Sequence, residues 1–106
     1  MVKPALLLLL LMPALALAEA PEVQLRIKDH RFIPAEVRVP PNQRVRLMVI
    51  NEDPTPEEFD SYALNREKVI AGGGRGALYI GPLAPGRYEF IGEFHEATAK
   101  GVIVAQ

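Results

Sequence analysis

A chain of 106 residues with 12 Lys and Arg against 13 Asp and Glu carries a formal net charge of −1 at pH 7. Because the two signs are interspersed and no basic surface can be expected, this balance argues against nucleic acid as a partner. The absence of cysteine excludes disulfide bonds and every metal site that requires a thiolate ligand.

The N-terminal segment has the layout of a secretory signal peptide. Lys3 precedes an apolar run over residues 5–17, and Ala-Leu-Ala at 16–18 provides small residues before Glu19. The apolar run has about 13 residues, whereas a helix needs roughly 20 to span a bilayer, so an uncleaved membrane anchor is the weaker alternative. We therefore predict a signal peptide over residues 1–18, cleavage after Ala18, a periplasmic location and no membrane span in the mature protein.

Short strand patterns separated by turn residues fill the rest of the chain, residues 19–106. Apolar and polar side chains alternate with period two in the first patterns, which is typical of strands with one face in solvent. The third pattern reaches Asn51 and is followed by Pro54 and Pro56, which exclude a helix interior or a central strand. Residues 61–71 show no clear pattern and are compatible with one helical turn. The strand patterns lie at residues 23–28, 36–39, 44–50, 77–80, 87–94 and 102–104.

Together these patterns predict a single all-β domain. Six or seven short strands at a spacing of roughly ten residues, without an amphipathic helix of convincing length, indicate a β-sandwich or a small barrel. The strand periodicity alone does not choose between the two.

The C-terminal part resembles the last hairpin of the cupredoxins. It reads Tyr88-Glu89-Phe90-Ile91-Gly92-Glu93-Phe94-His95, then a short loop and Gly101-Val102-Ile103-Val104. A blue-copper member of that family would place its cysteine at Gly92, its histidine at His95 and its methionine near Ala99 or Lys100. Only the histidine is present. Because a blue-copper site needs a thiolate with two imidazoles, this chain is not expected to be intensely blue.

Nearly all of residues 19–106 is similar to the cysteine-free cupredoxin-like proteins found with bacterial high-affinity iron permeases, and to the N-terminal domain of related periplasmic iron-uptake proteins. The resemblance implies an all-β, cupredoxin-like Greek-key β-sandwich of about seven strands. It also implies an accessory role in metal uptake or handling, with an inner-membrane metal permease or its accessory proteins as partner. A glutamate is more common where Asp60 stands. The segments that carry the resemblance are residues 51–53, 57–61, 65–70, 81–83, 85–88 and 92–95.

The candidate metal ligands combine one imidazole with several carboxylates. Glu58 and Asp60 are two positions apart, so on an extended segment both face one side while Phe59 faces the core. The resemblance places the His95 loop at the same end of the sandwich. Such a donor set suits Cu(II), Fe(III) or Zn(II) without choosing between them. We expect one copper or iron ion per chain at a non-blue site. The predicted ligands are His95, Glu58, Asp60, Glu67 and Glu93.

Each candidate also has an explanation without a metal. His95 can be a solvated loop histidine, and His30 is predicted to lie at the surface. Glu57, Glu58 and Asp60 can form a solvated acidic edge that discourages strand pairing, while Glu67 and Glu93 can belong to surface ion pairs.

The function therefore has two alternatives to a metal-binding accessory protein. One is a redox-active copper protein that assists iron oxidation for a permease, and the other is a metal-free interaction module. Whether the protein is an enzyme is left open, because a catalytic turnover is not implied and no hydrolase motif is present.

Overall fold

The computed structural model describes residues 3–4 and 19–106. Apart from residues 3–4, the predicted signal peptide lies outside this described part, so its cleavage stays a prediction. Within the described part, no helical segment has the length and hydropathy needed to cross a membrane.

Residues 22–105 form nine strands and one short 3-10 helix. The 3-10 helix, η1 (Glu93–His95), follows β8 directly and begins the loop that leads to β9. The strands are β1 (Glu22–Lys28), β2 (Arg31–Ile33), β3 (Glu36–Val39), β4 (Val45–Asn51), β5 (Glu57–Ser61), β6 (Arg66–Ile70), β7 (Arg75–Ile80), β8 (Gly86–Gly92) and β9 (Lys100–Ala105).

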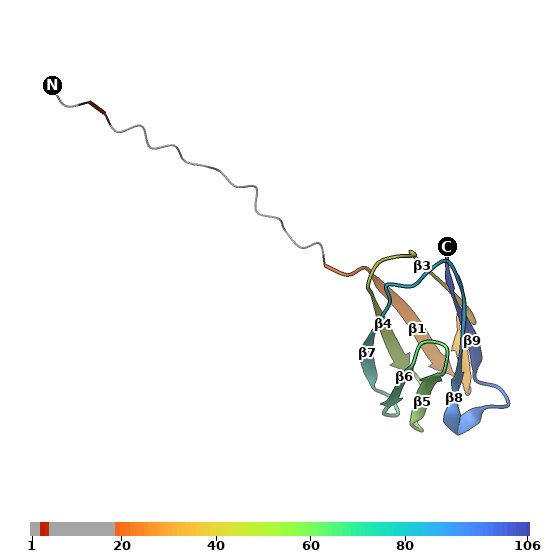
Figure 1. Cartoon of the computed structure of the whole chain (residues 1–106). Coiled ribbons are helices and arrows are strands. Elements are labelled where there is room, and N and C mark those ends of the chain that lie inside the picture. Colours follow the sequence, from red (N-terminus) through yellow and green to blue (C-terminus); the bar gives the residue numbers. More distant parts are fainter. Residues whose placement is uncertain (1–2, 5–18) are drawn as a thin grey trace.

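The strands pack as two facing sheets (Figure 1). The first sheet has the order β2-β1-β4-β7 and the second has the order β3-β9-β8-β5-β6. The pairs β1–β4 and β3–β9 are parallel, and the other pairs are antiparallel. The predicted all-β sandwich is confirmed, with nine strands instead of about seven.

Two of the additional strands, β2 and β6, leave little alternation in the sequence. β2 has three residues, and only the last residue of β6 is buried, because β6 lies at the edge of its sheet. The helical turn considered for residues 61–71 is absent: a turn at residues 62–65 leads into β6. The strand predicted to reach Phe94 ends at Gly92, where η1 begins.

Every second side chain of the central strands points into the core between the two sheets. In β4 every second side chain from Val45 to Asn51 is buried, and in β5 the side chains of Glu57, Phe59 and Ser61 are buried. The Phe59 ring stacks on the Phe90 ring, with 5.0 Å between the ring centroids. Glu58 and Asp60 therefore face outward, as predicted, and Glu57 faces the core.

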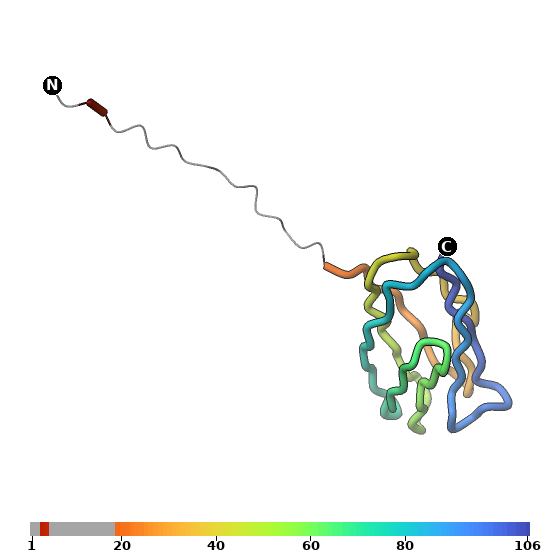
Figure 2. Tube along the Cα trace, viewed as in Figure 1, coloured from red at the N-terminus to blue at the C-terminus, as the bar shows by residue number. Residues whose placement is uncertain are grey.

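The loops that carry the candidate ligands gather at one end of the sandwich. Figure 2 shows the β8–β9 loop, in blue, at the end of the molecule opposite the C-terminus. The β1–β2 turn is tied to this loop, because the Oγ1 hydroxyl of Thr98 donates a hydrogen bond of 2.6 Å to the carbonyl of His30. We call this end, with residues 29–30, 51–60 and 92–99, the loop pole.

Candidate metal centre

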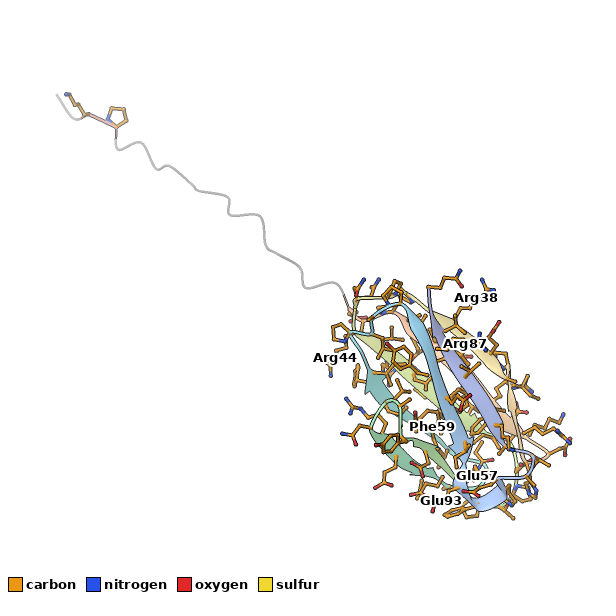
Figure 3. All side chains as sticks on the ribbon, turned by 45° about the vertical axis from the view of Figure 1, so that its right-hand side comes forward. Arg38, Arg44, Glu57, Phe59, Arg87 and Glu93 are labelled. Carbon is orange, nitrogen blue, oxygen red and sulfur yellow. The ribbon has the colours of Figure 1, made fainter. Side chains whose placement is uncertain are left out.

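A buried carboxylate holds the imidazole of His95. The side chain of Glu57 is 2% exposed, and its Oε2 lies 2.5 Å from Nδ1 of His95. Its Oε1 accepts hydrogen bonds from the backbone N–H groups of Glu58 at 3.0 Å and Phe94 at 2.9 Å. An ionised carboxylate can only accept, so with Glu57 ionised His95 donates from Nδ1, and in the neutral imidazole Nε2 then keeps its lone pair. Figure 3 shows Glu57 at the end of the sandwich away from Arg38 and Arg44.

His30 stacks on the imidazole of His95. The two ring centroids are 3.5 Å apart and the ring planes differ by 14°. His30 is half-buried: it lies in a turn at the surface, as predicted, and packs on His95 with one face. It occupies a two-residue turn between β1 and β2 in which both residues have positive φ, 52° at Asp29 and 57° at His30. This is the backbone geometry of a tight hairpin turn, and it is costly for residues other than glycine.

Asp53 holds this turn in place. Its Oδ1 accepts a hydrogen bond of 2.8 Å from the backbone N–H of Asp29, and its Oδ2 accepts one of 2.9 Å from that of His30. The backbone N–H of Asp53 donates in turn to the buried side-chain amide oxygen of Asn51. The hydrogen bond from the backbone of His30 lowers the pKa of Asp53 below its ordinary value, and the N–H of Asp29 and the charges of His30 and His95 act in the same direction against desolvation.

Replacing Asp53 with alanine is expected to lower the free energy of unfolding of the metal-free protein by about 2 kcal/mol, because two hydrogen bonds to a charged acceptor are lost. The pKa of Asp53 is lowered in the folded state, so this stabilisation is present above the ordinary value of 3.8 and is lost as the pH falls through the lowered pKa. Urea denaturation should therefore give a lower free energy of unfolding for the variant than for the wild type at neutral pH. The difference between the two should be smaller in acid. Glu96→Ala, on the exposed surface of the β8–β9 loop, is the control. A difference in the free energy of unfolding that does not change with pH would contradict the role given to Asp53.

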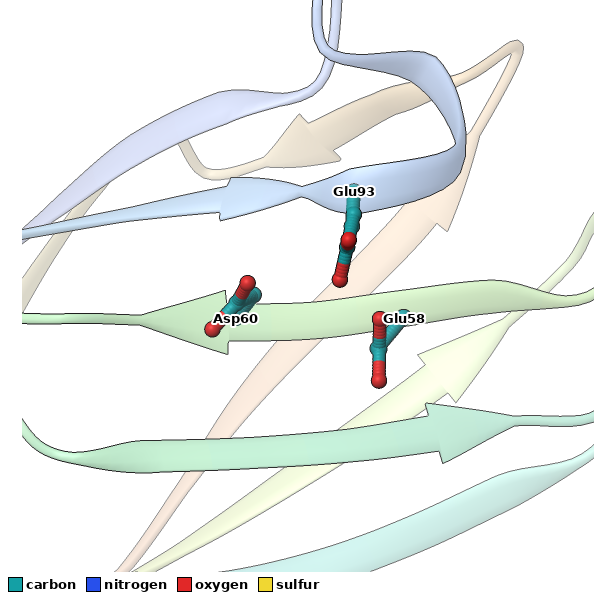
Figure 4. A group of neighbouring side chains, drawn as sticks. All are labelled: Glu58, Asp60 and Glu93. Carbon is teal, nitrogen blue, oxygen red and sulfur yellow. The ribbon is translucent and has the colours of Figure 1, made fainter.

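Three carboxylates form a second group on the outer surface of the loop pole. Glu58 and Asp60 point outward from β5, and Glu93 reaches them from the start of η1 (Figure 4). One oxygen of each lies within 4.8 Å of the others. The hydrogen bond and the negative charge of Glu58 raise the pKa of Glu93. We call this group the carboxylate cluster; its oxygens are ligands of the kind that hard cations take.

The structure thus divides the predicted ligand set into two groups. His95 contacts Glu57 and His30, and it is not a member of the carboxylate cluster. The division follows from η1: a 3-10 helix turns by about 120° per residue, so Glu93 and His95 face different sides, whereas a continued strand would have put them on one face. The alternation of side chains in β5 also separates the two groups, because Glu57 points toward the core and Glu58 points outward.

Glu67 lies apart from both groups. It pairs in register with Asp60 across β5 and β6, but it does not belong to the carboxylate cluster. It lines an open groove of about 650 Å³ together with Asp60, Tyr62 and Arg66. Neither His30 nor His95 lines this groove, so it is separate from the imidazoles.

A blue-copper site does not fit the residues at the loop pole. A Cβ added at Gly92, where a blue-copper cysteine would stand, would lie 2.6 Å from Cδ of Glu57 and 2.6 Å from Cβ of Ala99. The carboxylate of Glu57 fills the space that a thiolate side chain would need. Imidazole and carboxylate donors remain, and these fit Cu(II), Zn(II) or Fe(III) without a sulfur ligand.

Sequence reasoning missed three residues that build this centre: Glu57 as the partner of His95, His30 as its stacking neighbour, and Asp53 as the support of the turn. A signal existed for Glu57, because Phe59 is two positions away and faces the core, so Glu57 must face it too. No local signal pointed to His30, whose contact with His95 joins two sheets.

A family model described as "Cupredoxin-like domain" matches residues 2–105 of the chain. An uncharacterised protein of Rickettsia prowazekii (strain Madrid E) is 45% identical over 83 residues, which cover 78% of this chain and 66% of the relative. The chain therefore spans a little less than two thirds of that relative's length.

Solved structures of copper proteins share the fold. A purple cupredoxin from Nitrosopumilus maritimus matches with a TM-score of 0.62 and 17% identity, covering 79% of this chain and 99% of that chain. The metal-binding domain of the Cu(I)-exporting P-type ATPase of Streptococcus pneumoniae D39, solved with Cu(I), gives 0.70 and 14%, with coverages of 80% and 84%. Auracyanin A, a "blue" copper protein from Chloroflexus aurantiacus, gives 0.68 and 13%, with coverages of 80% and 98%. At these identities the similarity shows the fold alone, and the association with iron permeases stays a prediction.

Proposed function

Because the chain belongs to the cupredoxin-like domain family, we propose that it is a metal-binding accessory protein of copper or iron uptake or handling, with a non-blue site. The N-terminal segment directs it to the periplasm, where an inner-membrane metal permease or its accessory proteins are its partners. The observation that carries the proposal is the hydrogen bond between Nδ1 of His95 and the buried carboxylate of Glu57.

This hydrogen bond is the arrangement that prepares a histidine for a metal ion. Metal-ligating histidines almost always donate their second ring N–H to a carboxylate or a carbonyl, which sets the tautomer and increases the basicity of the ligating nitrogen. The oxygens of Glu57 are already occupied by the N–H groups of Glu58, Phe94 and His95, so Glu57 acts as a positioning residue. Nε2 of His95, on a side chain that is 25% exposed, is the ligand.

The carboxylate cluster lies on the same pole and supports cation binding in a different way. Its three negative side chains raise the local concentration of cations at the loop pole, an effect that salt reduces. The ion bound at the loop pole has one of two roles. It is cargo that is passed to the partner or, if it is copper, a centre that can change its oxidation state. The protein's own residues orient the ligand and supply the surrounding negative charge.

Isothermal titration of the purified protein with Cu(II), Zn(II) and Fe(III), the last supplied from a weak chelate, tests the proposal. We expect the wild type to bind one ion per chain and His95→Gln to lose at least the roughly 10- to 100-fold in affinity for Cu(II) and Zn(II) that an outer-shell change causes. The control is the triple variant Glu58→Gln, Asp60→Asn, Glu93→Gln, whose loss for Cu(II) should be smaller and should shrink at high salt. Equal affinity of wild type and His95→Gln for every ion would overturn the proposal and favour a metal-free interaction module.

A further inference from the structure

We propose that His30 is a second imidazole ligand of this centre, so that one ion is bound by nitrogens of His30 and His95 and the site selects Cu(II) over Fe(III). The inference rests on the proposed function. The inference adds three points to that function: a second ligand from a separate turn, the class of ion, and different ions for the imidazole pair and the carboxylate cluster.

The two rings lie close enough for one ion to reach both after one ring turns. The ring centroids of His30 and His95 are 3.5 Å apart and the planes are nearly parallel. Imidazole lone pairs lie in the ring plane, so in this stacked arrangement they do not converge on one point. Because Glu57 holds the ring of His95, binding requires the half-buried ring of His30 to turn by a large angle until one of its nitrogens faces the ion.

The turn that carries His30 has a costly backbone conformation that its surroundings hold in place. Two consecutive residues, Asp29 and His30, have left-handed φ angles, and each costs about 1–2 kcal/mol relative to an ordinary conformation. Three hydrogen bonds hold the turn, two to the carboxylate of Asp53 and one from Thr98. His30 does not belong to the hydrophobic core. Backbone strain maintained by the surrounding structure is typical of functional positions.

The donor type decides which ion this pair prefers. Imidazole nitrogens suit Cu(II), Ni(II) and Zn(II), and Cu(II) binds most tightly among the divalent first-row ions. Fe(III) is a harder cation and prefers oxygen, so the carboxylate cluster of Glu58, Asp60 and Glu93 is the better site for it. Cu(II) binding should therefore depend on His30 and His95, and Fe(III) binding should not.

Electron paramagnetic resonance of the protein with one equivalent of Cu(II) is the test, read together with Cu(II) titrations. The wild type should show coupling to nitrogens of two imidazoles, and His30→Asn should show coupling to one. Asparagine tolerates a positive φ as histidine does, so the turn is preserved, and thermal unfolding of the metal-free variant checks this. His30→Asn should lower Cu(II) affinity by at least about tenfold and leave Fe(III) affinity unchanged.

The outcomes separate this inference from the proposed function. If His30→Asn keeps the wild-type Cu(II) affinity and nitrogen coupling while His95→Gln loses both, His30 is a packing neighbour only, and the inference is wrong while the proposed function stands. If the wild type itself shows no imidazole coupling and no tight Cu(II) binding, the inference is wrong; if His95→Gln also leaves the affinities for Zn(II) and Fe(III) unchanged, the proposed function is wrong as well. Loss of one coupled nitrogen in each single variant would establish the pair.

Discussion

Replacing Glu57 with alanine is expected to lower the free energy of unfolding by about 3–5 kcal/mol, because a buried carboxylate with charge-assisted hydrogen bonds is removed. The backbone N–H groups of Glu58 and Phe94 and the Nδ1–H of His95 lose their acceptor. Denaturation with urea, compared with the wild type, measures the loss. Glu58→Ala is the matched control: it removes the same side chain from the next position of β5, on the outer face, and should change the free energy of unfolding by no more than about 0.5 kcal/mol.

A loss of that size is a large part of the stability of a small domain, which is about 5–15 kcal/mol. Glu57→Gln serves as the second variant because it keeps the volume and removes the charge. It should fold, and it should weaken Cu(II) binding by about 10- to 100-fold, since the amide cannot hold the His95 tautomer as the carboxylate does. If Glu57→Ala were as stable as Glu58→Ala, or Glu57→Gln bound Cu(II) like the wild type, the role given to Glu57 would be wrong.

Introducing a cysteine at residue 92 is expected to destabilise the protein by about 3 kcal/mol without creating a blue copper site. The new Cβ would overlap Glu57 and Ala99, and overpacking of this kind in a full core costs about 1–3 kcal/mol, with larger values when the neighbours cannot move. The thiolate would have no room to meet His95 at a common ion, so Cu(II)-loaded Gly92→Cys should lack the intense visible absorption of a copper–thiolate bond.

Gly92→Ala is the control for this substitution, because it adds the same Cβ without the sulfur. Both variants should lose similar stability in thermal or urea denaturation. An intensely coloured Gly92→Cys protein with wild-type stability would show that the carboxylate of Glu57 moves aside readily, and it would contradict the conclusion that the loop pole excludes a thiolate.

The resemblance to cupredoxins places a metal site at the loop pole, where the residues differ from those of a blue-copper protein. His95 stands where the resemblance places a histidine ligand, and Gly92 stands where it places a cysteine. The segment after Asn51 holds Glu57, which contacts His95 directly. The replacement of sulfur by a buried carboxylate favours an ion that is held by nitrogen and oxygen donors.

The sequence by itself determined the all-β class and the exclusion of thiolate chemistry. The alternation at residues 23–28, 36–39 and 44–50 predicted β1, β3 and β4, because burial on one face of a strand leaves a period of two in the sequence. The same rule placed Glu58 and Asp60 on one face and Phe59 on the other, as the structure has them. Applied to one more residue, it would have placed Glu57 in the core.

Only the tertiary structure decided which donors meet. The edge strand β6 buries one residue and leaves almost no pattern, and η1 turns Glu93 and His95 to different sides at a point where the sequence continues to read as a strand. The contact of His30 with His95 depends on where a turn of one sheet ends relative to a loop of the other. A local pattern reports the burial of single residues, whereas contacts between sheets are set by the packing of whole strands, so the imidazole pair could not be found from the sequence.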